Sequence, residues 1–488
     1  MLPDLYAKLS AYVEAFNADD DEFFSQCIDN AAAYDYLSRN IPLLDCPDKE
    51  LERTYYFRWW TLRKHWKETP VGHFLTEFFP AVNWAGPYNS INCAVGHHLR
   101  EARWLRDDEG WLWELMDFWL DGHGNALSYS SWLAEAVETV FALRPNEERM
   151  KACLPKLDAL YRQREELQLR PCGLYWSKDG RDGMEFSISG SGIRPTLNSY
   201  MCANARAIAR MAAAVGMDDM AEAYARRADA LQERIEALLW DGDFYRTIPC
   251  EKEDPADWAQ RPDIPDDNRV RELVGYIPWY FRLAKAEHDA AFAHLMDSDG
   301  FASPHGLTNA EQRHPRFLFT HPHECLWNGY VWPYATSQTL TAAANVIRDR
   351  GENAPLSAED FYKMLRTYAL SHRITDEDGN EHCWIDEDMH PYTGRWYARD
   401  ELKADNWNPK RGGYERGKDY NHSTFCDLVL DGLLGIHFEG DMLCAEPILP
   451  ASWDYFIVTG LTQENYTVLY DRDGSHYGCG KGLHIFKA

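Results

Sequence analysis

Helical periodicity runs through most of this 488-residue chain and constrains its fold more than any other feature. Apolar residues recur at the i, i+3 and i+4 spacing of amphipathic helices, and most of these segments follow one another as antiparallel-looking pairs. The segments are 21–38, 49–66, 90–105, 111–119, 128–143, 147–166, 197–215, 218–239, 270–283, 334–348, 358–371 and 423–434. This pattern predicts an all-α dominated fold, a toroid of helical hairpins.

The pattern changes near residue 438. Short runs of β-branched and aromatic residues at 456–458, 466–470 and 483–486 are separated by Gly, Asn and Asp. Such runs predict strands joined by tight turns. We therefore expect a helical barrel domain over residues 1–437 and a small antiparallel β-strand segment over 438–488 that packs on the barrel.

Five connections between the helical segments are too long to be simple turns. They cover residues 70–89, 171–196, 255–268, 297–333 and 375–421, and they are rich in Gly, Pro and aromatic residues. Long ordered loops usually carry function. We expect the functional site where these loops converge.

The composition favours a neutral, hydroxyl-rich ligand. The net charge of −28, from 50 Lys and Arg against 78 Asp and Glu, repels nucleic-acid phosphates and anionic membranes. The 19 Trp and 27 Tyr offer flat rings that stack on sugars, although large helical cores also contain many aromatic residues. A small carbohydrate is the expected partner, with no nucleic acid and no membrane. The sequence does not indicate an oligomeric state.

The sequence also favours a cytoplasmic location. No stretch approaches the roughly 20 apolar residues of a membrane span, and the N-terminus lacks the basic and apolar regions of a signal peptide. The 12 Cys are scattered and form no Cys-x-x-Cys pair, which is typical of reduced, mostly buried thiols.

Two loop motifs each contain an acidic residue beside Gly and aromatic residues. The first is Asp-Gly-Met-Glu-Phe-Ser at 182–187, and the second is Glu-Asp-Met-His-Pro-Tyr-Thr-Gly at 387–394. Inverting hydrolysis of a glycosidic bond needs one protonated carboxyl group and one carboxylate that activates water, about 6.5–9.5 Å apart. Glu185 and Glu387 are the candidates for these two groups.

Their neighbours indicate which carboxyl group is the acid. Glu185 lies in an apolar setting close to Asp179 and Asp182, where desolvation and like charge would raise its pKa. Glu387 lies between two Asp residues before a turn, a wetter and more polar setting that suits a general base. Asp182 is an alternative acid because either residue of this loop could face the substrate.

Three motifs together resemble those of the inverting (α/α)6-barrel glycoside hydrolases of families 37 and 63. Residues 183–187 resemble the family's Ser-Gly-Trp/Met-Asp-Phe/Asn-Ser signature, and 387–394 resemble Glu-x-Tyr-x-Pro-x-Thr-Gly. Residues 327–334, Trp-Asn-Gly-Tyr-Val-Trp-Pro-Tyr, resemble its Asn/Arg-Gly-Pro-x-Trp-Pro substrate loop. The motifs occur in the family's order within about residues 50–440. The family includes trehalases, the processing α-glucosidase, and mannosylglycerate and glucosylglycerate hydrolases.

The resemblance implies an (α/α)6 toroid, a six-hairpin glycosidase, with Glu185 as general acid and Glu387 as general base. It implies inverting cleavage of a small glycoside or oligosaccharide, such as an α-glucoside, an α-mannoside or a glycosylglycerate. Two departures indicate a divergent branch with a different substrate. Glu185 replaces the usual Asp, and Ile-Ser-Gly at 188–190 replaces the Arg-Trp or Pro-Arg that usually follows the Ser.

The loops supply further candidates for binding the substrate through rings, amides, carboxylates or guanidinium groups. These are Trp84, Asn89, Asp182, Arg194, Asn198, Trp327, Asn328, Trp332, Glu415 and Arg416. Trp84 could equally be a core residue, and Glu415 and Arg416 could simply pair with each other.

Two other functions are compatible with the pattern. A sugar epimerase or isomerase on the same barrel would use paired His, for which His97, His98, His321, His323 and His422 are available. A non-catalytic carbohydrate-binding protein would need only the aromatic walls. No cofactor is expected because no Gly-x-Gly-x-x-Gly or P-loop segment occurs. No metal is expected either, because His321-Pro322-His323-Glu324 lacks a third ligand at a usual spacing.

Overall fold

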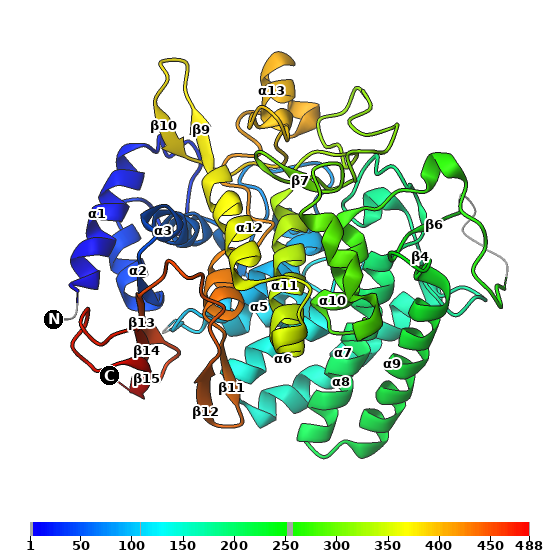
Figure 1. The fold of residues 1–488 in the computed structure, drawn as a ribbon, viewed down its shortest axis with the longest axis horizontal. Helices are drawn as coiled ribbons and strands as arrows, with labels where there is room; N and C mark the ends of the chain where they lie inside the picture. The colour runs from blue at the N-terminus through cyan, green and yellow to red at the C-terminus, as the bar shows by residue number, and fades with distance from the viewer. Residues whose placement is uncertain (1–2, 108, 251–256, 488) are drawn as a thin grey trace.

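Helices dominate the computed structural model, which describes residues 3–107, 109–250 and 257–487 (Figure 1). They form an (α/α)6 toroid of helical hairpins, as the sequence predicts. The α-helices are α1 (Leu5–Ala18), α2 (Ala33–Asn40), α3 (Lys49–Lys64), α4 (Val95–Ala102), α5 (Trp111–Leu120), α6 (Leu133–Leu143), α7 (Glu147–Gln168), α8 (Pro195–Ala214), α9 (Asp218–Leu239), α10 (Ile277–Tyr280), α11 (Pro333–Arg350), α12 (Ala358–Ser371) and α13 (Tyr397–Ala404).

Neighbouring helices pack side by side around the toroid. α3 contacts α12, α12 contacts α11, and α11 contacts α10. The series continues from α10 to α8, from α8 to α6, and from α6 to α4. α8 also packs along α7 and α9, which explains its alanines: Ala203, Ala205, Ala207 and Ala212 are buried where helices approach closely.

Local signals place several helices where the sequence predicts them. α9 and α12 have the predicted bounds, and α7 begins at the predicted residue. α12 starts with a capping box, in which Ser357 and Asp360 satisfy each other's backbone N–H groups. The side chain of Asn146 accepts a hydrogen bond from Arg149 N at the start of α7.

The prediction of a helix over 21–38 is wrong for residues 21–32, because α2 begins only at Ala33. The preceding segment is irregular: Asp20 pairs with Lys64 and Lys418, and Glu22 adopts a left-handed conformation with φ of 45°. Long-range ion pairs here outweigh local helix propensity.

The prediction of a helix over 270–283 is confirmed only for its middle part. This segment forms a 3₁₀ turn, Leu273–Tyr276, followed by the single turn of α10. The backbone N–H of Leu273 donates to the carbonyl of Asn309 in a distant loop (3.0 Å), so this N–H group is not available to a helix.

The segment predicted at 423–434 contains a π-helix, Leu428–Leu433. The helices α1 and α13 form where no helix was predicted.

The C-terminal strands form an antiparallel sheet in the order β1-β13-β14-β15. β13 (Tyr455–Leu461), β14 (Tyr466–Asp471) and β15 (Gly482–Lys487) cover the three predicted runs. The fourth strand, β1 (Leu43–Asp45), comes from the N-terminal part of the chain, with Leu44 opposite Val458. This sheet lies beside α1 and α2 at the left of Figure 1. The domain boundary at residue 437 stays a prediction.

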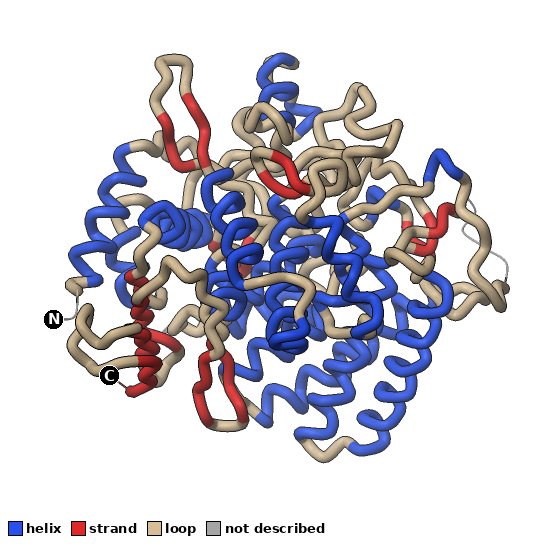
Figure 2. The backbone as a smooth tube through the Cα atoms, viewed as in Figure 1, coloured by secondary structure: helices blue, strands red, loops and turns tan. Residues whose placement is uncertain are grey.

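The remaining strands are short and lie mostly in the long connections. They form the hairpins β2 (Trp66–Thr69) with β3 (Gly72–Leu75), β7 (Ala302–Ser303) with β8 (Gly306–Leu307), β9 (Arg373–Thr375) with β10 (Glu381–Cys383), and β11 (Ile436–Glu439) with β12 (Met442–Ala445), and the sheet of β4 (Trp176–Ser177), β5 (Gly192–Ile193) and β6 (Ile248–Pro249). Much of the loop structure gathers above the helices in Figure 2.

None of the helices in the described part of the chain is both long enough and apolar enough to cross a bilayer. The cysteines are free thiols, and only Cys27 and Cys479 are exposed. This agrees with the expectation of reduced and mostly buried thiols.

Candidate active site

Four of the five long loops meet at a cavity of about 200 Å³. The cavity is lined by Glu77, Phe78, Trp84, Ile91, Cys93, Tyr129, Gly183, Glu185, His323, Glu324, Cys325, Trp327, Trp332, Tyr334, Glu387, Arg416, Tyr420 and His422. No described residue of the fifth loop, 255–268, contributes to this lining, and its first two residues lie outside the described part of the chain. The convergence of the other four loops agrees with the sequence-based expectation.

Backbone hydrogen bonds join the three sequence motifs into one unit. Trp327 N donates to the carbonyl of Glu185 at 3.0 Å. Val331 and Met389 exchange two backbone hydrogen bonds of 2.9 Å each. The loop at 327–334 therefore connects the segment of Glu185 to the segment of Glu387.

The backbone around Glu185 is sharply bent. Gly183 has φ of 73°, and a Cβ atom there would lie 2.7 Å from Cys93 Sγ, so this position requires glycine. Phe186 adopts φ of 60°, a conformation that costs a non-glycine residue about 1–2 kcal/mol. Its ring packs on His321 with centroids 3.7 Å apart, which helps to hold this turn. The bend directs the Glu185 side chain to the cavity.

The environment of Glu185 favours the protonated form. Removal from water raises the pKa of this carboxyl group to about 7, and the negative charges of Asp179 and Glu387 add to the effect. A backbone hydrogen bond and the charge of Arg416 act in the opposite direction. The sequence predicts an upward shift of this pKa from desolvation and from the charges of Asp179 and Asp182; desolvation and Asp179 contribute, whereas Asp182 is not among the main causes.

Asp182, the alternative acid, has both oxygens engaged by the protein. Its Oδ1 accepts hydrogen bonds from Ser130 (2.6 Å) and Ser177 (2.5 Å). Its Oδ2 accepts from Arg194 Nε (2.6 Å) and from Thr196. Asp182 is 2% exposed and does not line the cavity, so this geometry favours Glu185 as the group that faces a substrate.

Glu387 is buried and paired, which corrects the expectation of a wetter setting. It is 1% exposed, and its two Asp neighbours are buried as well. Its Oε1 accepts from Nε of Arg416 at 2.7 Å and also from Nη2, while its Oε2 accepts from the Cys325 thiol at 2.9 Å. A guanidinium group from a loop 29 positions further along the chain balances this charge in place of bulk water.

The two Asp neighbours of Glu387 hold the loop in place. Asp386 Oδ1 accepts from the backbone N–H of Glu387 at 2.9 Å. Asp388 Oδ1 accepts from Ala398 N at 3.0 Å, in the first turn of α13. Burial raises the pKa of both Asp carboxyl groups, that of Asp386 to about 7. These residues position Glu387 and do not line the cavity.

Arg416 connects three parts of the cavity wall. Besides Glu387, it donates from Nη1 to Glu324 Oε1 at 2.7 Å, and its guanidinium lies 5.3 Å from the ring centre of Trp84. Its expected pairing with Glu415 does not form. Glu415 instead pairs with Arg399 (2.7 Å) and lines a separate cavity of about 910 Å³ that neither Glu185 nor Glu387 reaches.

Aromatic side chains form one wall. Trp327 and Trp332 stack with centroids 4.3 Å apart, and Trp332 Nε1 donates to the carbonyl of Leu326 at 2.9 Å. Trp327 Nε1 is buried and has no hydrogen-bond partner among the described residues. Trp84 lines the cavity while remaining partly exposed, so it is not simply a core residue.

The structure does not bring five other candidates into the cavity lining: Asn89, Arg194, Asn198, Asn328 and Glu415. Each of them contacts the protein itself, although Asn328 Oδ1 is buried without a partner among the described residues. Asn89 donates to the carbonyls of Phe78 and Pro80, and Asn198 donates to those of Tyr175 and Arg194.

Sequence analysis missed Glu77, a third carboxyl group at the cavity. Burial raises its pKa to about 8, and the charges of Glu387 and Glu185 add to the effect. Tyr420 donates to its Oε1, and its Oε2 is buried without a partner in the described part of the chain. Glu77 is the one acid in the apolar run Phe-Leu-Thr-Glu-Phe-Phe at 74–79, a signal that could have identified it.

Three of the five histidines named for the epimerase alternative do not suit an acid–base pair. Burial lowers the pKa of His98 to about 4 and holds those of His97 and His422 well below their usual value. His422 lines the cavity, but its ring stacks on Tyr420 at 3.6 Å. These three rings stay neutral near pH 7, so none of them supplies the acid of the epimerase alternative.

His323, Glu324 and Cys325 lie close enough together to hold a metal ion. Their ligand atoms are already engaged, however. Glu324 pairs with Arg411 and Arg416, and the Cys325 thiol donates to Glu387. Nothing in this arrangement calls for a metal.

Comparison with known proteins gives the family. Residues 87–423 match the mannosylglycerate hydrolase MGH1-like glycoside hydrolase domain. A solved structure named "Sialidase" is 37% identical and superposes with a TM-score of 0.87 over 99% of this chain, but over only 43% of its own length. The cyclic β-(1,2)-glucan synthase NdvB of Rhizobium meliloti (strain 1021) is 23% identical over 290 residues, which are 56% of this chain and 9% of the synthase.

A more distant structure shares the fold. The family 63 mannosylglycerate hydrolase of Thermus thermophilus, solved with glucose, is 14% identical, with a TM-score of 0.53 over 77% of this chain and 98% of its own. The present chain thus spans less than half the length of the sialidase and of the synthase. Because the family match covers more than half of its residues, the chain belongs to the mannosylglycerate hydrolase MGH1-like glycoside hydrolase family.

Proposed function

We propose that this chain is an inverting glycosidase that releases one neutral sugar from a small glycoside. Glu185 is the general acid and Glu387 the general base. The observation that carries this proposal is that two carboxyl groups from loops about 200 residues apart line one cavity in contrasting environments. The carboxyl group of Glu185 is desolvated and forms no ion pair with a described residue. The carboxylate of Glu387 pairs with Arg416.

Each group performs one proton transfer. The proton of Glu185 passes to the glycosidic oxygen as the bond to the anomeric carbon breaks. A water molecule attacks that carbon from the opposite face, and Glu387 takes up its proton. The products are the free sugar, with inverted configuration, and the alcohol of the leaving group.

The size and charge of the cavity indicate the sugar. A volume of about 200 Å³ is below the roughly 300–1,000 Å³ of pockets for drug-sized ligands, which suits a single sugar ring. The one guanidinium of the lining, that of Arg416, already pairs with Glu324 and Glu387, and no other Arg or Lys is found among the described lining residues. This balance disfavours an anionic sugar. We therefore propose a neutral glycone, as in an α-glucoside, an α-mannoside or a glycosylglycerate.

The stereochemistry of the product tests the mechanism. A panel of neutral α- and β-glycosides is incubated with the protein, and proton NMR is recorded before mutarotation. The first product from any cleaved substrate should carry the inverted anomeric configuration, because Glu387 activates water and does not attack the sugar. Initial release of the retained anomer, or a sugar trapped covalently on Glu387, would contradict this mechanism.

The pH dependence follows from Glu185. With a pKa of about 7 in the free protein, this acid loses its proton as the pH rises through 7, so kcat/KM should fall on the alkaline side. Asp179→Asn removes a negative charge that raises this pKa, and the alkaline limb should move to lower pH. Asp454→Asn, at a side chain that is 68% exposed, serves as the control. An alkaline limb that stays in place in Asp179→Asn would show that another group controls it.

A further inference from the structure

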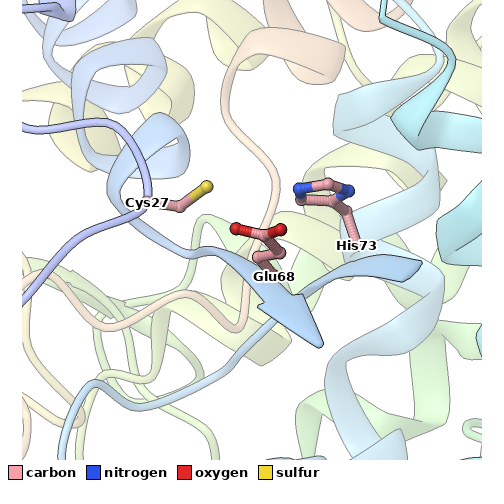
Figure 3. Close-up of side chains that lie close together, drawn as sticks. All are labelled: Cys27, Glu68 and His73. Carbon is pink, nitrogen blue, oxygen red and sulfur yellow. The ribbon is translucent and has the colours of Figure 1, made fainter. Parts of the chain in front are cut away.

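A second cluster of reactive side chains lies outside the cavity. Cys27 comes from the segment between α1 and α2, Glu68 from β2, and His73 from β3. One potential ligand atom from each lies within 4.8 Å of the others, and Figure 3 shows the three side chains pointing toward one another. Glu68 and His73 are directly opposite in the β2–β3 hairpin, so the hairpin register fixes two members of the cluster.

The orientation of the His73 ring is set by two contacts. Its Nδ1 lies 2.7 Å from Glu114 Oε2, and the same oxygen accepts from the His73 backbone N–H at 2.8 Å. The ring stacks on Trp111 with centroids 4.2 Å apart and planes within 12°. With Nδ1 engaged, Nε2 is the nitrogen available to a ligand. A carboxylate that holds the far side of a His ring is the usual support of a metal-binding His.

We propose that Cys27 Sγ, the Glu68 carboxylate and His73 Nε2 bind a divalent transition-metal ion, with Glu114 as a positioning residue behind His73. Thiolate, imidazole and carboxylate together suit zinc best. Binding replaces the proton of the Cys27 thiol by the metal, which releases one proton and makes binding tighter as the pH rises. Water completes the coordination.

Metal binding requires a small movement of the three side chains toward one another. A tetrahedral ion with bonds of about 2.0–2.3 Å holds its ligand atoms about 3.3–3.8 Å apart. Atoms that lie within 4.8 Å of one another therefore need to approach by at most about 1.5 Å. Cys27 and Glu68 are exposed, so rotation of their side chains supplies this movement without repacking the core.

Binding at this site would fasten an irregular segment to the barrel. The segment of Cys27 includes Asp20, which pairs with Lys64 of α3 and with Lys418, two positions from Arg416. The β2–β3 hairpin leads into Glu77 of the cavity wall. The metal would link the segment of Cys27 to the β2–β3 hairpin. This structural function does not depend on the proposed hydrolysis.

A third cluster provides the matched control. His437, Glu439 and Cys444 in the β11–β12 hairpin have the same residue types. The Nδ1 of His437 contacts the carbonyl of Gly435 at 2.8 Å, and no carboxylate supports the ring from behind among the described contacts. This cluster tests whether the residue types alone are sufficient.

The experiment uses the full chain after removal of metal. Zn²⁺ affinity is measured by competition with a chromophoric chelator, and Co²⁺ is used to detect a thiolate-to-metal charge-transfer band. The unsubstituted protein should show this band and one tight Zn²⁺ site. Glu114→Gln should weaken Zn²⁺ binding about 10–100-fold, as expected for loss of a supporting carboxylate. Cys27→Ser should abolish the band and weaken binding further, while Cys444→Ser should change neither.

A second measurement does not depend on variants. Zn²⁺ should slow modification of Cys27 by a thiol reagent, read by peptide mass spectrometry, but should not protect the other exposed thiol, Cys479. The proposal is overturned if Zn²⁺ binds equally to the unsubstituted protein and Cys27→Ser, if Cys444→Ser is the variant that loses the band, or if Cys27 is not protected.

Discussion

Glu387→Gln should fold normally yet lower kcat by about 10²–10⁴-fold, the usual contribution of a general acid or base. The amide keeps the volume of the side chain and its contact with Arg416, but it cannot take a proton from water. Glu185→Gln should cause a similar loss because it removes the proton donor. Steady-state kinetics on the substrate found by the glycoside panel measures both.

The leaving group distinguishes the two roles. An aryl glycoside with a very acidic phenol needs little protonation, so Glu185→Gln should recover much of its rate on that substrate, whereas Glu387→Gln should not.

Glu77→Gln is the control within the cavity. With a pKa of about 8, Glu77 is already neutral near pH 7, so its replacement by the amide should lower kcat far less. Near-normal turnover in Glu387→Gln would reject the assignment. Sugar binding without turnover in the unsubstituted protein would indicate a carbohydrate-binding protein.

Arg416→Met should have the largest effect on stability. It leaves Glu387, which is 1% exposed, without its cationic partner, while Glu324 keeps its pair with Arg411. Removing one partner of a buried pair costs about 3–5 kcal/mol of unfolding free energy. Activity should also fall because Glu387 would bind a proton to avoid a buried charge. Denaturant unfolding measures the first effect, and kinetics measure the second.

A double variant separates stability from catalysis. Arg416→Met with Glu387→Gln removes the uncompensated charge at position 387 and should recover part of the lost stability while remaining inactive. A loss below about 1 kcal/mol in Arg416→Met alone would match an exposed ion pair and would contradict the buried network described here.

Features that depend on residues close together could be read from the sequence. The capping box of Ser357 and Asp360 marks the start of α12, and the run of β-branched and aromatic residues at 466–470 marks β14. Helix periodicity indicated the hairpin toroid because each amphipathic helix must bury one face. The two acidic motifs could likewise be found, since Gly183 and its neighbours form a local bend that any fold must accommodate.

Other features depend on partners that are distant in the sequence. The register of the motif favours Glu185 over Asp182 as the acid, but only the Ser130, Arg194 and Thr196 contacts show that Asp182 is engaged by the protein. β1 pairs with β13 across more than 400 positions, and no local pattern specifies such a partner.

The sequence also could not predict the environment of each carboxyl group. Polar neighbours at 386–388 indicated a wet setting for Glu387, yet the loop is buried and Arg416 balances its charge. Glu77 belongs to no motif and reaches the cavity because the loop after β3 folds over it. The sequence determined which residues could do acid–base chemistry, since that depends on side-chain type and local bends. The tertiary structure decided which of them meet and how each is charged, because desolvation and ion pairing depend on segments that are brought together only by folding.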